Sequence, residues 1–301
     1  MIKNLTSRDE QFLSSLSRIQ GRIDRATAQV SSGLRVTSAS DAPDEIGPLL
    51  QSRAELALTE QARSNLNRVK GEVDSAEGAL RSVIRLTERV RVLGTQGQTG
   101  TQTAAMRQTI AAEVQGVFQQ IVGAANSSFE GRFLFAGNND QVEPYQVDLT
   151  QPDGVAPYAG TAATRSVADA NGLLIPVARS GQEIFNSPTS GKNLFGAINA
   201  LRSALLANDE TALSTANENL ASALNAVNVQ LTRYGHTQND IASALETASK
   251  RSLDLKSKIS SIEDTDLADA ILELQTGQTA RQAALQAKGQ EDRRTLFDFL
   301  R

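Results

Sequence analysis

An acidic group in the last third of the chain is the first candidate for metal or acid–base chemistry. Glu263, Asp264, Asp266 and Asp269 lie close together in the sequence. A calcium loop needs alternating oxygen ligands and a turn glycine, and this segment lacks the glycine. A carboxylate just before a helix accepts hydrogen bonds from its free N–H groups, and one in the first turn interacts favourably with the helix dipole. We therefore interpret Asp264 or Asp266 as the cap of a helix beginning at Leu267.

A single histidine and the absence of cysteine restrict nucleophilic and metal chemistry further. No thiol nucleophile, disulfide or thiolate metal site can form, and a metal site with two histidines is excluded as well. His236 could act as a general base only with a distant serine or aspartate, which nothing in the sequence marks. We interpret His236 as a surface or junction residue, and we expect neither catalysis nor a cofactor.

Three glycines at regular spacing could suggest a phosphate-binding loop. Gly94, Gly97 and Gly100 are followed by no Gly-Lys-Ser/Thr sequence, and no predicted strand precedes them. They lie in a Gln/Thr-rich stretch, which we interpret as a turn between two helices.

The composition favours slender helices over a thick globular core. Of the 301 residues, 40% are hydrophobic but only 4% are aromatic, and tryptophan is absent, so Ala, Leu, Ile and Val must supply most of the burial. The formal net charge is −4, which argues against a nucleic-acid-binding protein. No apolar run is long enough to span a membrane, and the first residues do not resemble a cleavable signal peptide.

The first segment has the apolar spacing of a coiled coil. From Phe12 onward the apolar steps are four, three, four, three and four residues, which is a/d spacing. An amphipathic helix packed on its own domain's core would show a similar pattern, so that interpretation stays open. The apolar positions are Leu5, Phe12, Leu16, Ile19, Ile23, Ala26 and Val30.

Two long helical segments flank a stretch rich in prolines and turns. One helix is predicted from near Ile46, with Asp41 as a plausible N-cap, to Leu93. Its seam runs from Leu66 to Val90 in alternating steps of three and four residues, and long helical seams return after Leu194. Between them, Asn171-Gly172 is a strong hairpin signal. The fold class is therefore mainly α: a coiled-coil-like rod formed by the N- and C-terminal segments, with a small β-rich insertion. The expected domains are terminal helices at 1–42 and 267–301, a helical rod at 43–137 and 190–266, and the insertion at 138–189.

The seam of the first helix cannot stabilise that helix alone. Burying its six large apolar side chains contributes roughly 9–18 kcal/mol, whereas ordering the backbone costs on the order of 26–52 kcal/mol. Helical hydrogen bonds offset only part of that difference. We expect both termini to pack on each other and on neighbouring subunits, and to become ordered on assembly. The predicted subunit contacts are Leu5, Phe12, Leu16, Ile19, Ile23, Val30, Leu34, Leu267, Ile271, Leu274, Leu285, Leu296, Phe297, Phe299 and Leu300.

Motifs at both ends resemble those of the bacterial flagellin superfamily, which includes the hook-associated proteins. The stretch Ser31–Ala39 followed by Asp41 is similar to the N-terminal signature of that family, and Ile262–Ala268 is similar to its C-terminal one. Within the superfamily, Phe129–Gly137 and the ending Leu296–Leu300 resemble the hook–filament junction proteins. The residues that match family motifs are Ser32, Gly33, Leu34, Arg35, Asp41, Gly131, Arg132, Phe135, Gly137, Asp264 and Asp266.

This resemblance implies an extracellular structural protein of the flagellum, without catalytic residues, metal or cofactor. The chain would be exported through the flagellar type III apparatus without a cleaved signal, with an export chaperone bound at its C-terminal region. Its copies would form a ring between hook-associated protein 1 and flagellin, with no nucleic-acid or membrane partner. Arg301 after Leu300 is more familiar from flagellins, so a short flagellin that forms the filament itself is the alternative.

Overall fold

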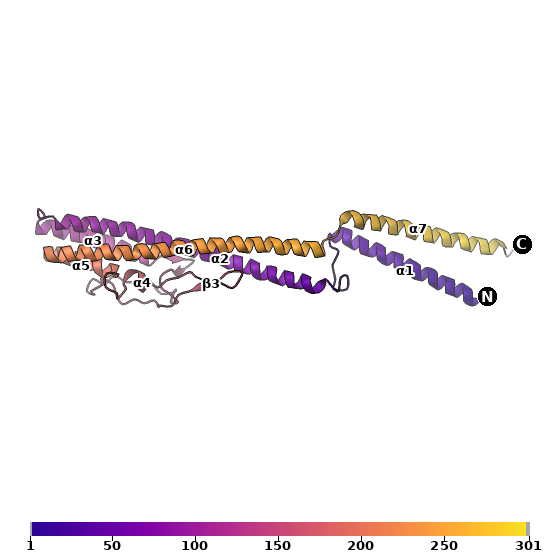
Figure 1. Cartoon of the computed structure of the whole chain (residues 1–301), viewed down its shortest axis with the longest axis horizontal. Coiled ribbons are helices and arrows are strands. Elements are labelled where there is room, and N and C mark those ends of the chain that lie inside the picture. Colours follow the sequence, from indigo (N-terminus) through magenta and orange to yellow (C-terminus); the bar gives the residue numbers. More distant parts are fainter. Residues whose placement is uncertain (1, 299–301) are drawn as a thin grey trace. The chain divides into compact units, whose positions relative to one another are not determined.

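The computed structural model describes the backbone of residues 2–298 and the side chains of residues 9–290. The chain is mainly α-helical, as predicted (Figure 1). None of the helices within residues 2–298 has both the length and the apolar character needed to cross a membrane. The elements are α1 (Ile2–Ser32), α2 (Ile46–Gln98), α3 (Ala104–Ala125), β1 (Ser128–Phe129), β2 (Arg132–Phe133), β3 (Ser166–Ala168), β4 (Leu174–Pro176), α4 (Gly181–Phe185), α5 (Leu194–Ala207), α6 (Glu210–Glu263) and α7 (Leu267–Asp298).

The chain forms two compact units. One holds the chain up to Ala57 together with the chain from Arg251 onward, and the other is Leu58–Lys250. The first contains α1, α7 and the adjoining ends of α2 and α6. The second contains the remainder of α2 and α6 with α3, α5 and the short elements between them.

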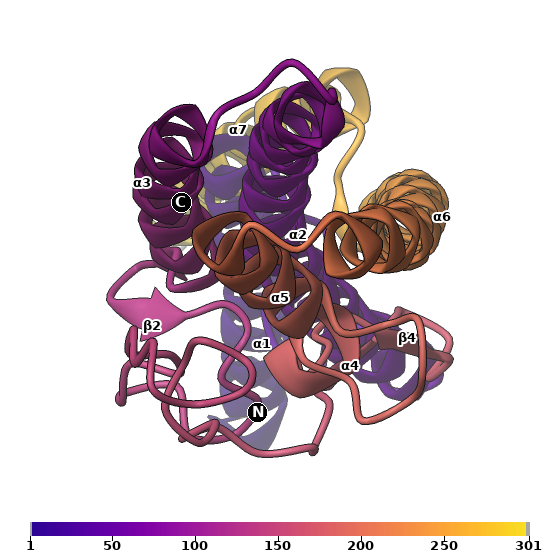
Figure 2. The same cartoon turned by 90° about the vertical axis from the view of Figure 1, so that its left-hand side faces the viewer.

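The core of the Leu58–Lys250 unit lies among α2, α3, α5 and α6, which Figure 2 shows nearly end-on. The predicted apolar seam of α2 is buried from Leu66 to Val90, as its four-and-three spacing indicated. The few aromatic residues gather in one place: the rings of Phe118 and Phe195 meet edge to face at 5.8 Å, and Tyr145 meets Phe195 at 5.0 Å. The edge-to-face geometry of these aromatic pairs contributes stabilising free energy beyond that from the apolar area they bury.

One buried arginine connects several helix ends in this core. Arg107, in the first turn of α3, is only 2% exposed. Its Nε donates to the carbonyl of Gly97 at 2.9 Å, near the end of α2. Its Nη1 donates to Asn208 Oδ1 at 2.6 Å, at the end of α5, and its Nη2 to Glu210 Oε1 at 2.8 Å, at the start of α6. The buried charge is tolerated because Nε, Nη1 and Nη2 of the guanidinium group each have an acceptor.

The turn between α2 and α3 is shorter than the glycines indicated. Helix α2 continues to Gln98, so Gly94 and Gly97 lie inside it and only Gly100 lies in the connection. A Cβ on Gly94 would lie 2.2 Å from Asn217 Oδ1, and one on Gly97 would lie 2.4 Å from Leu205 Cδ2. The two glycines therefore allow close approach of α5 and α6 to α2 instead of ending the helix.

The segment between α3 and α5 contains short strands and turns. The predicted hairpin at Asn171-Gly172 is confirmed, because β3 and β4 pair antiparallel with Val167 opposite Ile175. A second hairpin is formed by β1 and β2, and β2 ends at Phe133. Phe135 turns into the core, where it is fully buried against Phe185.

Candidate assembly site: the terminal helices and their joint

Helix α1 lies beside α7 (Figure 1), the partner that the sequence indicated for its apolar seam. Ile23 and Ala26 are buried. A Cβ on Gly277 would lie 2.8 Å from Cγ1 of Ile23, so the absence of a side chain at this position of α7 allows the close contact. The other described seam positions, Phe12, Leu16, Ile19 and Val30, are half-buried.

Polar contacts link α1 and α7 on either side of this seam. Arg22 Nε lies 2.6 Å from Glu273 Oε1, and this hydrogen bond lowers the pKa of the Glu273 carboxyl. Lys288 Nζ lies 2.6 Å from Asp9 Oδ1 and 5.9 Å from the centre of the Phe12 ring. Because these contacts are largely exposed, they fix the pairing of the helices more than they stabilise it.

One side of α7 carries apolar side chains that α1 does not cover. Leu267, Ile271 and Leu285 are exposed, and Leu272 beside them is 62% exposed; Leu274 is half-buried. The role of the predicted positions in contacts between subunits stays a prediction. Five further predicted contacts, Leu5, Leu296, Phe297, Phe299 and Leu300, have side chains outside the described residues.

The segment after α1 pairs with the link between α6 and α7. Leu34 and Asp264 form an isolated antiparallel bridge. The backbone N–H of Arg35 donates to the carbonyl of Glu263 at 2.6 Å, and that of Thr265 to the carbonyl of Gly33 at 3.0 Å. Gly33 has a φ of +72°, a left-handed conformation that favours glycine after a helix. The two family motifs, which are far apart in the sequence, thus meet.

Two arginines hold this joint through their side chains. Arg35 contacts Glu45 and also donates to the carbonyl of Ile262 at 2.6 Å. Arg53 contacts Glu263, which is buried. Glu263 thus serves as an ion-pair partner at the joint. The same unit contains a small apolar cluster, which consists of Val36, Ala42, Leu49, Ile46, Ile259 and Ile262.

Asp41 does not cap α2, contrary to the prediction. Its Oδ2 accepts from the backbone N–H groups of Thr37 at 3.0 Å and Ser38 at 2.7 Å, so it closes the preceding turn. These hydrogen bonds, with one from the Thr37 hydroxyl, lower the pKa of Asp41 to about 2. The sequence suggests a cap equally well, because aspartate accepts from N–H groups in either position.

Asp266 is the cap of α7. Its Oδ1 accepts from the N–H of Ala268 at 2.9 Å and of Asp269 at 3.4 Å, whereas Asp264 bonds the hydroxyl of Ser260. Three members of the acidic group considered for metal binding, Glu263, Asp264 and Asp266, are therefore engaged in structural contacts. His236 is exposed on α6.

The remaining family motif lies in the Leu58–Lys250 unit, where it shapes the β1–β2 hairpin and the turn after it. Gly131 has a φ of +78° in the hairpin turn. Gly137 has a φ of +65°, and a Cβ there would lie 2.3 Å from the carbonyl oxygen of Thr161. Arg132 and Phe135 lie between them, the former exposed and the latter fully buried.

The two ends of the chain match known sequences. Residues 5–140 match the bacterial flagellin N-terminal helical region, and residues 217–300 match the bacterial flagellin C-terminal helical region. The chain belongs to the bacterial flagellin family.

Relatives of this flagellin-family chain include hook-associated proteins. It is 26% identical over 303 residues to flagellar hook-associated protein 3 of Salmonella typhimurium, and the match covers 92% of each chain. Among solved structures, a Vibrio parahaemolyticus protein assigned as flagellar hook-associated matches 74% of this chain and all of its own, with 22% identity and a TM-score of 0.66. Hook-associated protein 3 of Legionella pneumophila matches 72% of this chain and 97% of its own, with 16% identity and a TM-score of 0.58.

Some contacts between the terminal helices of this flagellin-family chain could not be predicted from the sequence. The pairs Arg22–Glu273 and Lys288–Asp9 link positions too far apart for any local pattern to indicate them. Gly277 did carry a signal, because glycine costs about 1 kcal/mol relative to alanine inside a helix. The signal is weak, because a Cβ on Gly289 in the same helix would have nothing within 4 Å.

Proposed function

We propose that this chain is a structural subunit of the bacterial flagellum that joins the hook to the filament. The similarity to hook-associated protein 3, which extends over 92% of both chains, supports the position at the junction. The observation that carries the proposal is the incompletely covered terminal helix pair: α1 covers one side of α7, and apolar side chains remain exposed on the other.

The exposed side of α7 gives a physical reason for assembly. Covering Leu267, Ile271, Leu272 and Leu285 with apolar surface of a neighbour would contribute up to roughly 1.5–3 kcal/mol for each side chain, less what their present partial burial contributes. Repeated around a ring, this contact is made by every copy. The helix pair thus provides the surface through which subunits associate, and the rod and the insertion need not rearrange.

The partners in this proposal follow from the position at the junction. The chain would contact further copies of itself in a ring, hook-associated protein 1 on the hook side and flagellin on the filament side. It would reach that position outside the cell through the flagellar type III apparatus, with an export chaperone bound at the C-terminal region until export. The family is one of structural flagellar proteins, and the proposal requires no catalytic step.

A charge on the exposed side of α7 tests the proposal. In a strain lacking the chromosomal gene, Ile271→Asp should abolish filament attachment, because burying an aspartate against apolar surface costs several kcal/mol. Ile271→Leu, which keeps an apolar side chain, is the matched control and should restore filaments. Electron microscopy of the hooks and the amount of variant in the medium separate failed assembly from failed export. Normal filaments with Ile271→Asp would contradict the proposal.

The wild-type chain tests the junction role against the filament role. Hooks from a strain lacking it should carry no filament, whereas flagellin should appear in the medium. Purified protein that grows into long filaments by itself would instead identify a short flagellin.

A further inference from the structure

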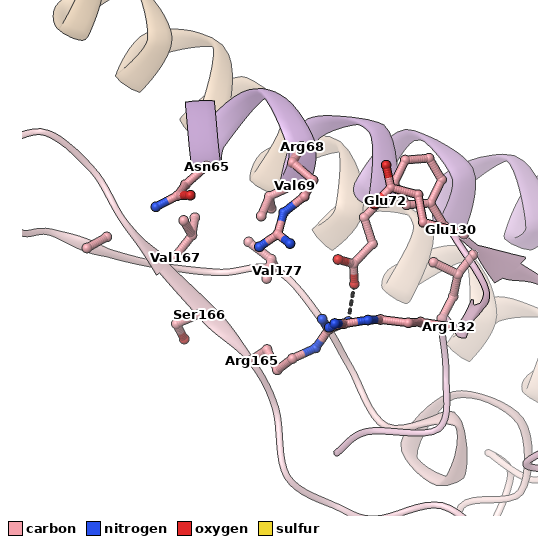
Figure 3. A pocket seen from close by; sticks show the side chains of 13 residues that line it. Asn65, Arg68, Val69, Glu72, Glu130, Arg132, Arg165, Ser166, Val167 and Val177 are labelled. Atoms are coloured by element: carbon pink, nitrogen blue, oxygen red, sulfur yellow. Dashed lines mark hydrogen bonds and ion pairs between the residues drawn. The ribbon is translucent and has the colours of Figure 1, made fainter. Parts of the chain in front are cut away.

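A cavity of about 540 Å³ lies in the Leu58–Lys250 unit, between α2, the β1–β2 hairpin and the β3–β4 hairpin. The proposed function does not use it. Its lining combines charged groups with apolar walls, as Figure 3 shows: Arg68 and Glu72 come from α2, Arg132 from β2, Arg165 from the residue before β3, and Val69 and Val167 lie between them.

Positive charge is in excess in this cavity. Figure 3 shows the side chains of Arg68, Arg132 and Arg165 directed toward the space beside Glu72. Arg165 forms an ion pair with Glu72, and Arg132 lies 3.7 Å from Asp140. Arg68 donates no hydrogen bond to any of residues 9–290. The second carboxylate in the lining is that of Glu130, which is exposed in the turn of the β1–β2 hairpin.

The guanidinium groups retain unused donors. Nε of Arg165 is buried and has no hydrogen-bond partner among the described residues. A buried donor without a partner costs free energy, so an acceptor brought to it would be favoured. Burial raises the pKa of the Glu72 carboxyl more than the neighbouring arginines lower it. The lining holds three arginines against Glu72 and the exposed Glu130, so the cavity can accept one further negatively charged group.

Glu130 adds a conformational observation at the same place. Its φ is +50° and that of Gly131 is +78°, so a glutamate occupies a left-handed turn position where asparagine, aspartate or glycine is usual. Strained non-glycine residues persist where the surrounding structure holds them, and they cluster at ligand sites. This turn connects Phe129 and Arg132, which pair across the hairpin and both line the cavity.

We propose that this cavity binds a carboxylate, supplied by an aspartate or glutamate side chain of a neighbouring copy of this chain. A guanidinium presents parallel N–H groups that match both oxygens of a carboxylate. The apolar wall formed by Val69 and Val167 suits the methylene groups of such a side chain. The chain as a whole is acidic, with 34 Asp and Glu against 30 Lys and Arg, so a basic cavity on it is complementary to the surface of a second copy. The identity of the donor rests on the proposed assembly; the carboxylate site itself does not.

Titration of the full-length chain tests the site. The probe is N-acetylglutamate α-amide, and its neutral isostere N-acetylglutamine α-amide is the control ligand. Nitrogen-15 resonances of the arginine Nε groups should shift at Arg68, Arg132 and Arg165 with the acid and stay unchanged with the amide. Arg68→Ala should weaken binding at least tenfold, whereas Arg85→Ala, an exposed arginine on the same helix, should bind as wild type. Equal shifts with both ligands, or unchanged binding by Arg68→Ala, would overturn the proposal.

Charge reversal tests the source of the carboxylate. In the strain lacking the chromosomal gene, Arg68→Glu should reduce the fraction of hooks with filaments at least tenfold at normal export, and Arg85→Glu should not. If the acid binds in the titration but Arg68→Glu assembles normally, a free carboxylate is the ligand and the neighbouring copy is wrong. If the wild-type chain does not restore filaments, the proposed function fails while the titration still decides the site.

Discussion

Ile23 of α1 and Gly277 of α7 pack against each other so closely that a Cβ on Gly277 would lie 2.8 Å from Cγ1 of Ile23. Ile23 is buried at this point. The contact lies near the ion pair Arg22–Glu273, so apolar packing and a charged pair fix the pairing of the two helices together. The glycine is thus a packing residue of the terminal pair.

Alanine at Gly277 should loosen the pairing of α1 and α7. Inside a helix, alanine is favoured over glycine by up to about 1 kcal/mol. Here the added methyl must displace Ile23, and such overpacking costs about 1–3 kcal/mol. We expect Gly277→Ala to lower amide hydrogen-exchange protection around Ile23. Gly289→Ala is the matched control, because nothing lies within 4 Å of the added Cβ there; it should preserve or raise protection. Equal protection in both variants would contradict this account.

Arg107 should be a main determinant of stability in the Leu58–Lys250 unit. Arg107→Ala removes a buried guanidinium that donates to Gly97, Asn208 and Glu210, so we expect a loss of about 3 kcal/mol in the free energy of unfolding, roughly 1 kcal/mol for each hydrogen bond. Arg107→Lys should recover only part of it, because an ammonium group cannot reach all three acceptors.

Denaturant unfolding measures this loss. Arg89→Ala, which removes an exposed ion pair with Glu113, is the matched control and should cost less than about 1 kcal/mol. Similar unfolding midpoints for Arg107→Ala and Arg89→Ala would show that the buried fork does not stabilise the helix ends.

Acid should open the turn that Asp41 closes. The pKa of Asp41 is about 2 in the folded chain, below its ordinary value of 3.8, so its stabilising contribution is complete above that ordinary value. The contribution is lost as the pH falls from about 4 toward 2, because the protonated carboxyl is a poorer acceptor for Thr37 and Ser38. The protection factor of the Ser38 amide, which corrects for the pH dependence of intrinsic exchange, should therefore fall over that range. Asp41→Asn should exchange faster at neutral pH and lose this dependence; an identical pH profile would assign it to another group.

Alanine should change the stability of the protein in opposite directions at two glycines of α2. Gly97→Ala places a methyl 2.4 Å from Leu205 Cδ2, so we expect destabilisation by about 1–3 kcal/mol. Gly78→Ala has open space around the new Cβ and should stabilise by up to about 1 kcal/mol. Thermal unfolding of both variants checks the difference, and stabilisation by Gly97→Ala would show that α5 and α2 can separate without cost.

The fold could be predicted from the sequence wherever an apolar repeat ran for several turns. The seam from Leu66 to Val90 indicated a buried helix face correctly, and Asn171-Gly172 indicated its hairpin, because both signals are local. Glycine was less informative: Gly94 and Gly97 indicated a turn, yet both lie within α2. A glycine that ends a helix and one that admits a neighbouring helix look alike until that neighbour is known.

The candidate site was predictable in part for the same reason. The α1 seam was evident from its spacing, and so was a capping carboxylate before Leu267, which proved to be Asp266. No local pattern indicated the joint, because Arg35 and Ile262 are 227 positions apart and no periodicity links them. Only the resemblance to flagellins placed both motifs in one family, and it gave no contact between them.

The pairing of Leu34 with Asp264 has a consequence for the order in which the molecule is completed. A chain that is synthesised or threaded from its N-terminus presents residues 33–36 long before their hydrogen-bonding partners at 263–265 arrive. Such distant pairing carries a high entropic cost of loop closure, so it forms late. During passage through a narrow conduit, the first helix would therefore lack its partner helix. The hydrogen bonds between residues 33–36 and 263–265 would form only when nearly the whole polypeptide had emerged.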